Sequence, residues 1–411
     1  MFASLHIASF RWYAAGMAGS NVGTWMHRVA QAWLVLQLTG KPFMLGVATA
    51  LQFAPMLFVG PWAGALADRT DRRRLLIASQ LALALQAAVL AVLVLTGAAT
   101  TAVVLGAALV LGIVTAIDGP ARQSFVSDLV DRRTLPNAVA LNASSFNAAR
   151  LIGPALAGLV IAAWGTGVVF AVNAATFSIM LIALLHIRVD SGPRADRRRA
   201  TVADGIRYVS GHRDLTFVIL TVGLVAMLVL NFQMTIAIMS TEAFGVGPEL
   251  YGVLASLMAV GSLTGSLIAA KRSRTSLGLV TSAAVTLSLG TVVAGLAPGP
   301  AAFAATLMLI GVSALLMMTG ANSYIQTHTS AQHRSRVMAL YLALFFGTTL
   351  AGAPLVGWIA GTAGPRAGLI LPGLLALASV VALRIWLRRG DRTRPLAVQR
   401  HGSAVRVALA A

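Results

Sequence analysis

The sequence predicts an all-α membrane protein whose twelve transmembrane helices form two pseudo-symmetric six-helix bundles. Of its 411 residues, 58% are hydrophobic and only 10% are charged, whereas a soluble domain is about 25% charged. The apolar runs are long and do not alternate with polar residues, which favours helices over the strands of a membrane barrel. This composition excludes a water-soluble fold.

Twelve apolar segments are separated by glycine, proline or clusters of charge, and each is about long enough to cross a bilayer. Several connections hold only a few residues, so neighbouring helices must run antiparallel as hairpins. The predicted spans are 13–38, 43–67, 75–96, 101–118, 138–163, 167–187, 215–240, 250–270, 277–297, 301–323, 337–361 and 367–387. The beginning of the chain shows no cleavage pattern of a signal peptide, so we expect the first span to stay in the mature protein.

Lysine and arginine are distributed unevenly over the predicted loops. If the N-terminus is cytoplasmic, 27 of these cations lie on the cytoplasmic side, and only Lys41 and Arg366 lie on the other. Short cytoplasmic loops are enriched in both residues. We therefore expect both termini to be cytoplasmic. The net charge of +19 is therefore explained by cations in the cytoplasmic loops beside the lipid bilayer, and it does not indicate a nucleic-acid partner.

The predicted spans divide into two halves around one long hydrophilic segment. We expect an N-terminal bundle over 1–187, a cytoplasmic linker over 188–214, a C-terminal bundle over 215–388 and a basic cytoplasmic tail over 389–411. Within the linker, apolar side chains at helical spacing predict an amphipathic helix on the membrane surface, with a solvated loop as the alternative.

Glycines recur between the halves at a shift of about 200 residues, as expected for a protein built from repeated bundles. Gly60 and Gly64 correspond to Gly261 and Gly265, and Gly153 and Gly158 correspond to Gly352 and Gly357. Small residues at this spacing let helix backbones approach closely.

The loop after the second span, GALADRTDRRR, resembles the loop signature of the major facilitator superfamily. Its matching residues are Gly64, Asp68, Arg69, Arg72 and Arg73. Asp71 replaces the second glycine of the signature, and the second half has Ala269 where the acid would be. The resemblance implies a transporter built from two bundles.

The resemblance also implies a gate. In the family, the acid of this loop lies near an arginine four residues later, which meets an acid at the end of the fourth span. Carried over, these residues are Asp68, Arg72 and Asp118. They would hold the halves together on the cytoplasmic side when the cavity faces outward, and they would separate when it faces inward. The alternative is that Asp68 only offsets the positive loop.

The segment from Asp118 to Gly158 resembles the siderophore-exporter branch of the superfamily, typified by enterobactin exporters. Its Gly153, Pro154 and Gly158 resemble the fifth-span motif associated with exporters. Proline removes a backbone donor and bends the helix, which gives a close-packed interface. Thr115 stands where many drug exporters carry an arginine, so the resemblance assigns no proton-carrying residue.

Charged residues inside the spans are few, and each costs about 2.5 to 3.5 kcal/mol at the middle of a membrane helix. Arg28 is expected either to meet an anionic ligand or to be structural, whereas Arg150 is expected to be structural. His27 could carry a coupling proton or be a hydrogen-bonded helix contact. The candidate substrate-binding residues are His27, Arg28, Gln31, Asn147, Arg150, Asn231 and Gln233.

These observations predict a secondary transporter in a bacterial cytoplasmic membrane that exports a small amphipathic molecule, siderophore-like or drug-like, by alternating access. We expect proton coupling, an anionic or neutral substrate and a monomer. The alternatives are a lipid or lysolipid translocator, a receptor and a membrane enzyme. The chain has no cysteine, no metal-ligand cluster, no Ser/His/Asp set and no nucleotide loop, so we expect no cofactor, no metal and no catalysis.

Overall fold

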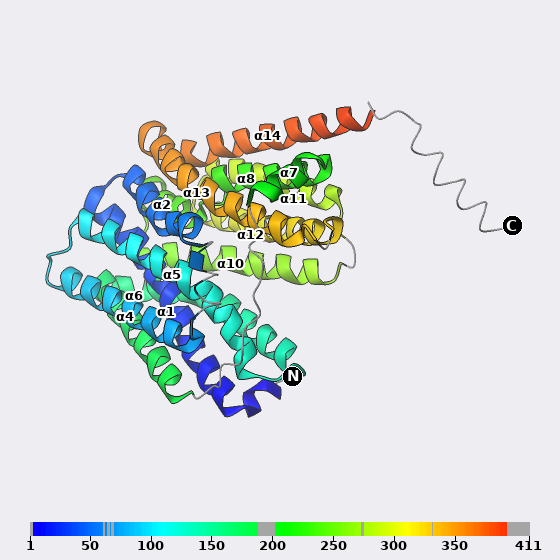
Figure 1. The fold of residues 1–411 in the computed structure, drawn as a ribbon. Coiled ribbons are helices and arrows are strands. Elements are labelled where there is room, and N and C mark those ends of the chain that lie inside the picture. Colours follow the sequence, from blue (N-terminus) through cyan, green and yellow to red (C-terminus); the bar gives the residue numbers. More distant parts are fainter. Residues whose placement is uncertain are drawn as a thin grey trace.

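Each regular element is a helix in the part of the chain that the computed structural model describes, which is residues 3–60, 62–63, 66, 70–187, 202–272, 275–330 and 332–392 (Figure 1). The N-terminal half holds η1 (Ala3–His6), α1 (Ala8–Thr39), α2 (Pro42–Phe58), α4 (Arg72–Leu95), α5 (Thr101–Leu129) and α6 (Leu135–His186). The C-terminal half holds α7 (Val202–Ser210), α8 (Arg213–Leu228), α9 (Phe232–Ile238), η2 (Met239–Ala243), α10 (Pro248–Ala270), α11 (Leu277–Gly295), α12 (Pro300–His328), α13 (Arg334–Ala363) and α14 (Ala367–Arg392).

The described helices follow the twelve predicted spans in order. Among the described residues, nine helical stretches are long and apolar enough to cross a membrane, and one of them combines α8, α9 and η2. One of the nine, α6, is 52 residues long and is interrupted at Gly165, whose φ of 81° favours glycine. The first two spans correspond to α1 and α2. The prediction of an all-helical membrane fold is therefore confirmed.

Contacts with α1 show that α6 reverses direction at Gly165 and crosses the membrane twice. Before Gly165, Asn137 accepts a hydrogen bond from Ser4, and Gly153 packs against Trp25. After Gly165, the contacts return along α1 toward Gly16, which lies against Met180. The two parts of α6 are thus the fifth and sixth spans, joined by a tight turn.

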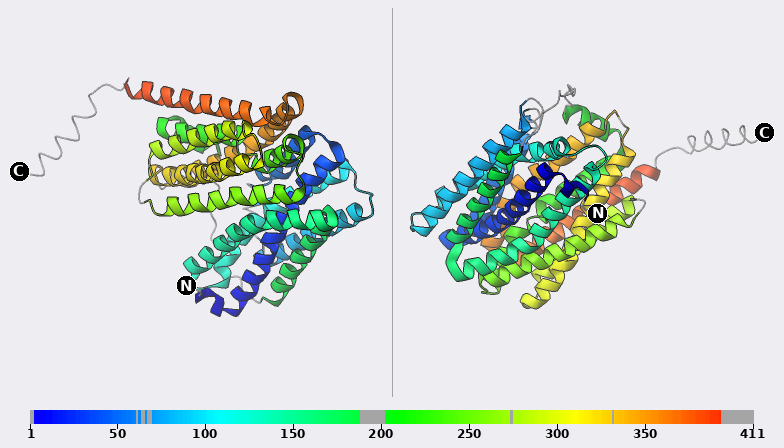
Figure 2. Two further views of the ribbon diagram at one scale, coloured as in Figure 1. Left: turned by 180° about the vertical axis from the view of Figure 1, so that it is seen from behind. Right: turned by 90° about the horizontal axis from the view of Figure 1, so that it is seen from below.

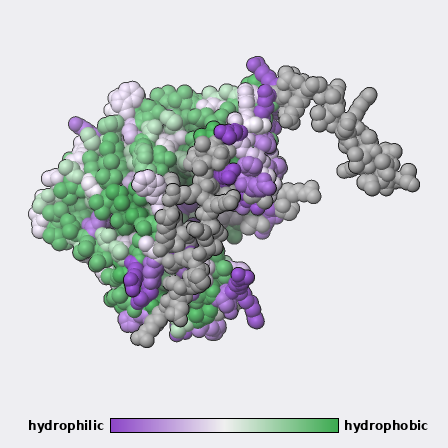
Figure 3. Space-filling view, viewed as in Figure 1, coloured by the Kyte–Doolittle hydropathy of each residue, from purple (hydrophilic) through white to green (hydrophobic). Residues whose placement is uncertain are grey.

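The surface of α4 shows how the bundle meets lipid. Leu85, Val89 and Val92 are more than half exposed and lie on one face of the helix, whereas Leu83 and Leu90 are buried on another. Similar apolar side chains cover much of the molecular surface (Figure 3). Since such a surface is unfavourable in water, this face is suited to the bilayer.

The two halves touch mainly along two pairs of helices, α6 with α10 and α2 with α13, and α9 also touches α1 and α2. They diverge toward the side at which α1 begins and α14 ends (Figures 1 and 2). The distribution of cations predicts that this open side faces the cytoplasm.

Two parts of the second half depart from simple membrane helices. The seventh predicted span is broken between α8 and α9, where Asn231 adopts a φ of −90° and a ψ of 36°. Helix α7 lies within the predicted linker and packs against α8 and α13. Residues 188–201 and 393–411, which complete the predicted linker and tail, lie outside the described residues.

Candidate functional site

A polar cluster lies where α1 and α2 of the first half meet α9 of the second. Arg28, Gln31, Gln52 and Gln233 line a cavity of about 20 Å³ there. Nε of Arg28 and Nε2 of Gln52 are buried and have no hydrogen-bond partner among the described residues. A cavity of this size holds about one water molecule. The cluster thus has unused donors, and it must widen before it admits a larger ligand.

Hydrogen bonds fix the side chain of Gln31 and the backbone of Gln233. Gln31 donates a hydrogen bond to the carbonyl oxygen of Val104 at 3.3 Å. The backbone carbonyl of Gln233 accepts one from the Tyr251 hydroxyl, also at 3.3 Å. The cluster therefore brings together three residues that the sequence proposed as substrate ligands, namely Arg28, Gln31 and Gln233.

Trp25 lies beside both arginines of the membrane interior. The guanidinium carbon of Arg28 is 5.1 Å from the centre of its indole ring, and that of Arg150 is 5.8 Å away. Phe53 is a second aromatic neighbour of Arg28, at 5.9 Å. Aromatic faces attract cations. The rings therefore offset part of the positive charge in a region where no described carboxylate contacts either arginine.

Arg150 also connects the two halves. Its Nη2 donates a hydrogen bond to the hydroxyl of Ser262 on α10 at 3.1 Å. One turn further along α6, the backbone N–H of Ala155 donates to the hydroxyl of Ser256, again at 3.1 Å. These bonds add directional contacts to the packing of α6 against α10.

The fifth-span motif forms the closest part of this contact. A Cβ atom on Gly158 would meet the carbonyl oxygen of Pro248, and one on Gly252 would meet that of Pro154. Glycine at both positions is therefore required for the backbones to approach this closely. The sequence predicted a close-packed interface at Gly153, Pro154 and Gly158. In the structure Pro154 and Gly158 meet α10, whereas Gly153 packs against Trp25 of α1.

A second contact repeats the same arrangement between α13 and α2. Here a Cβ on Gly357 would meet the carbonyl oxygen of Pro42, and one on Gly46 would meet that of Ala353. Pro42 and Gly46 have the same spacing as Pro248 and Gly252. The halves thus touch through two contacts that are related by the internal repeat.

His27 lies inside the first half. Its Nδ1 accepts a hydrogen bond from Asn173 of α6 at 3.1 Å, and its ring packs edge-on against Phe170. The imidazole is only 1% exposed. It is held as a hydrogen-bonded contact between helices, which was one of the two interpretations of this residue.

Two asparagines proposed as substrate ligands lie apart from the cluster. Asn231 donates a hydrogen bond to the carbonyl of Met227 at 2.9 Å and stabilises the break before α9. Asn147 donates to the carbonyl of Ala143 on its own helix. Its side chain lines a different and larger cavity.

That larger cavity has a volume of about 670 Å³ and lies between α1, α4, α5 and α6. Asn21, Thr24, Asp118, Arg122 and Asn147 are among its lining residues, so polar and charged groups interrupt a wall that is otherwise mainly apolar. Thr24 is one helical turn from Arg28. The large cavity therefore lies next to the Arg28 cluster.

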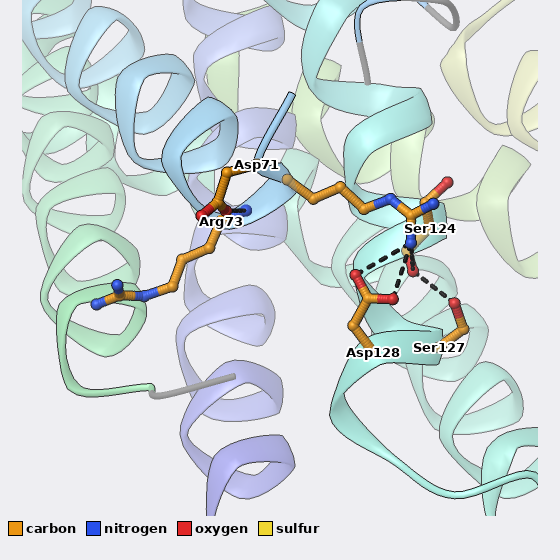
Figure 4. A network of polar contacts seen from close by, with 6 residues as sticks. Asp71, Arg73, Ser124, Ser127 and Asp128 are labelled. Carbon is orange, nitrogen blue, oxygen red and sulfur yellow. Dashed lines mark hydrogen bonds and ion pairs between the residues drawn. The ribbon is translucent and has the colours of Figure 1, made fainter. Parts of the chain in front are cut away.

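The basic loop organises one end of the first half (Figure 4). Asp71 caps α4 by accepting a hydrogen bond from the backbone N–H of Arg73 at 2.9 Å. Arg72 binds Asp128 of α5, with Nη1 at 2.8 and 3.0 Å from the two carboxylate oxygens. The Arg73 side chain donates to the carbonyl of Leu184 at 2.8 Å. These contacts join α4 to α5 and α6 within one half.

Arg72 and Asp118 have different partners in this structure. Arg72 pairs with Asp128, and Asp118 pairs with Arg122 and accepts a hydrogen bond from Gln80 at 3.0 Å. The reason is that α5 continues to Leu129, beyond the predicted end of the span at 118. The acid at the end of this helix is therefore Asp128. Gly64, Asp68 and Arg69 lie outside the described residues. Because the halves diverge on the side where the gate would close, the gate stays a prediction.

Sequence reasoning missed six residues of these sites: Trp25, Gln52, Gln80, Arg122, Asp128 and Ser262. Spacing alone indicates two of them, because Arg122 follows Asp118 by four residues and Arg28 follows Trp25 by three, so each pair lies on one face of a helix. The other four meet their partners across the fold, so no local pattern could identify them.

The chain is similar to known membrane transporters. A family model described as transmembrane secretion effector, from the major facilitator superfamily, matches residues 1–409. The staphyloferrin A transporter of Staphylococcus aureus is 26% identical over 253 residues, which are 61% of this chain and 64% of that protein. The match thus spans less than two thirds of that relative. The multidrug efflux pump Tap of Mycolicibacterium fortuitum is 27% identical over 390 residues, or 90% and 93% of the two chains.

Solved structures show the same fold at low identity. The nucleoside transporter NupG has a TM-score of 0.73 at 11% identity, covering 94% of this chain and 100% of that one. A bacterial homologue of the human lysosomal transporter Spinster, in an inward-facing and occupied conformation, has a TM-score of 0.72 at 14% identity, covering 94% and 96%.

Proposed function

This chain belongs to the transmembrane secretion effector family of the major facilitator transporters, and we propose that it exports a small amphipathic molecule, anionic or neutral, across a bacterial cytoplasmic membrane. The match confirms the superfamily that the loop signature indicated. The observation that carries the substrate class is the Arg28 cluster, which joins the halves and holds buried donors without partners among the described residues.

The charge of the substrate follows from the cluster. Arg28 has a guanidinium group surrounded by carboxamides, and among the described residues it forms no ion pair. A permanent cation would be repelled there, because an unpaired charge in a low-dielectric cavity is costly. An anion, or a neutral molecule with acceptor oxygens, would satisfy the unused donors.

Two features support outward transport. The Gly153, Pro154 and Gly158 motif resembles that of exporters, and its Pro154 and Gly158 belong to the α6–α10 contact that joins the halves. The Tap relative, which is matched over nearly its whole length, is an efflux pump. We propose the same direction here, toward a siderophore-like or drug-like substrate.

The transport cycle alternates between two arrangements of the halves. In the structure, the α6–α10 and α2–α13 contacts are closed, while the first half holds a large cavity next to the Arg28 cluster. We assign the open side to the cytoplasm, in line with the loop cations. Export then requires both contacts to open as the bundles 1–187 and 215–388 rock about the cluster, while the loop that holds Gly64, Asp68 and Arg69 closes the cytoplasmic side.

A proton gradient is the proposed energy source, and the experiment tests it together with the substrate. The purified full-length protein is reconstituted into liposomes loaded with 2,3-dihydroxybenzoate, citrate, erythromycin, tetraphenylphosphonium or a fluorescent lysolipid. We expect an anionic or neutral probe to be released faster when a pH gradient drives protons toward the cytoplasmic side of the protein. Transport of tetraphenylphosphonium alone, or of the lysolipid alone, would overturn the proposal.

A further inference from the structure

Asp118 is a carboxylate buried within the membrane-spanning part of α5. Its residue is 5% exposed, and seventeen residues of the helix precede it, counted from Thr101. One carboxylate oxygen accepts a hydrogen bond from the Gln80 amide at 3.0 Å, and the other pairs with Nε of Arg122. The sequence placed this acid at a membrane edge, in a gate with Arg72.

The groups around Asp118 come from the helices packed on α5. From α1, Tyr13 lies close to both Asp118 and Arg122, and Met17 contacts the guanidinium group. From α4 comes Gln80, and the residues of α6 that line the same cavity are uncharged. Among the described residues, the charged group in contact with Asp118 is therefore Arg122.

The site can satisfy both protonation states of the carboxyl group. The carboxylate form uses the Gln80 amide N–H and Arg122 as donors. A neutral carboxylic acid carries an O–H that needs an acceptor. Oε1 of Gln80 is buried without a partner among the described residues, as is the Tyr13 hydroxyl. A rotation of the Gln80 amide would bring its oxygen to the protonated acid, since the two amide orientations are close in shape.

The large cavity gives this carboxyl group access to water. Asp118 and Arg122 both line the cavity of about 670 Å³, so a proton can be exchanged with water there. The charged form is costly to bury unless it stays paired. An ionisable residue inside a membrane-spanning helix is by default a candidate for a functional site.

We propose that Asp118 carries the coupling proton. The O–H bond of Asp118 breaks, the proton passes to water in the large cavity, and the resulting carboxylate pairs with Arg122 and accepts from Gln80. In the reverse step the carboxylate takes a proton from water, and Arg122 is released. This inference rests on the proposed proton-coupled export.

An infrared titration of the purified full-length protein tests the proton site without any substrate. We expect the band of a buried carboxylic acid to appear as the pH falls, and to be lost in Asp118→Asn. The matched control is Asp128→Asn, which removes an acid of the same helix that is also paired with an arginine; it should retain the band. Asp118→Glu keeps an acid and should move the band, which decides the matter if the Asn variant does not fold. Persistence of an unchanged band in Asp118→Asn or Asp118→Glu, or its absence from the unmodified protein, would overturn the proposal.

A transport measurement separates this proposal from the proposed function. In liposomes, Asp118→Asn should still exchange 2,3-dihydroxybenzoate without a gradient but should lose the acceleration by a pH gradient. Retained acceleration in this variant excludes Asp118 as the carrier. If the unmodified protein exchanges none of the probes, the proposed function fails, while the infrared result still decides the proton site.

Discussion

Arg28 and Arg150 share one aromatic neighbour, since their guanidinium carbons lie 5.1 and 5.8 Å from the centre of the Trp25 indole. The first arginine belongs to the cluster between the halves, and the second bonds to Ser262 across the α6–α10 contact. Trp25 therefore links the candidate substrate site to an inter-half contact.

Replacement of Trp25 by leucine should destabilise the protein. A cation–π contact contributes about 0.5 to 1 kcal/mol when exposed and about 2 kcal/mol or more when desolvated, so we expect Trp25→Leu to lower the free energy of unfolding by about 1 to 3 kcal/mol. Thermal unfolding in detergent, followed by light scattering, measures the change. Trp358→Leu is the control, since that side chain is 56% exposed. Equal losses in the two variants would argue against a special role of Trp25.

Replacement of Arg28 by glutamine should weaken binding of an anionic substrate. The change removes the charge but keeps hydrogen-bond donors, so the expected loss is about 1.5 to 3 kcal/mol, as for a charge-assisted hydrogen bond. Arg28→Lys should recover part of it, and less if the contact is bidentate. Binding titrations measure these values. Tight binding of a quaternary ammonium compound, unaffected by Arg28→Gln, would refute the anion site.

Arg150→Gln should behave differently from Arg28→Gln. Because Arg150 is bonded to Ser262, the substitution should reduce stability more than it reduces substrate affinity. Thermal unfolding and binding titrations on the same preparation separate the two effects. A large loss of affinity with unchanged stability would instead place Arg150 in the binding site.

A larger side chain at Gly252 should prevent closure of the α6–α10 contact. The Cβ would meet the Pro154 carbonyl, so Gly252→Leu should favour a state in which this side is open. A cysteine at Gln37, which lines a cavity beside this contact, should then react faster with an impermeant maleimide. Gly106→Leu is the matched control, because a Cβ atom at Gly106 would have no described neighbour within 4 Å outside its own helix. Unchanged labelling would mean that this contact does not seal the outer side.

The ion pair between Arg72 and Asp128 should show energetic coupling in a double-mutant cycle. The pair is partly exposed, with 16% and 21% of the two side chains accessible, so the expected coupling between Arg72→Gln and Asp128→Asn is about 0.2 to 1 kcal/mol. Arg72→Gln and Asp118→Asn should be additive. Energetic coupling of Arg72 with Asp118 instead of Asp128 would support the gate that the sequence predicted.

Membrane orientation can be tested because the chain contains no cysteine. Single cysteines at Gly247 and Ser273 should be labelled from the outside and from the cytoplasmic side, respectively, if the loop cations set the topology. Labelling of both positions from one side would contradict the twelve-span arrangement.

The helical fold could be predicted from sequence because span length and loop charge are local properties. The end of α5 could not be predicted in the same way. Asp118 and Pro120 indicate a helix end, yet α5 continues to Leu129, and Arg122 and Gln80 satisfy the buried acid within it. That compensation comes partly from another helix, so it is invisible in the local pattern.

The candidate site shows the same division. Arg28 was recognisable because a cation inside a span is rare. Its neighbours Gln52 and Gln233 join it only when α1 and α2 pack against α9. In the same way, Gly158 predicted a close approach, while the identity of the helix that approaches it depends on the arrangement of the halves.

The four glycine contacts between the halves are made by backbone atoms. Such atoms carry no titratable group and no net charge, so neither acid nor salt can loosen these contacts directly. A proton that binds at Asp118 must therefore act on these contacts indirectly, through the movement of rigid helices. The chemistry of energy conversion and the barrier that it opens would then be separate parts of the molecule, each free to change without the other.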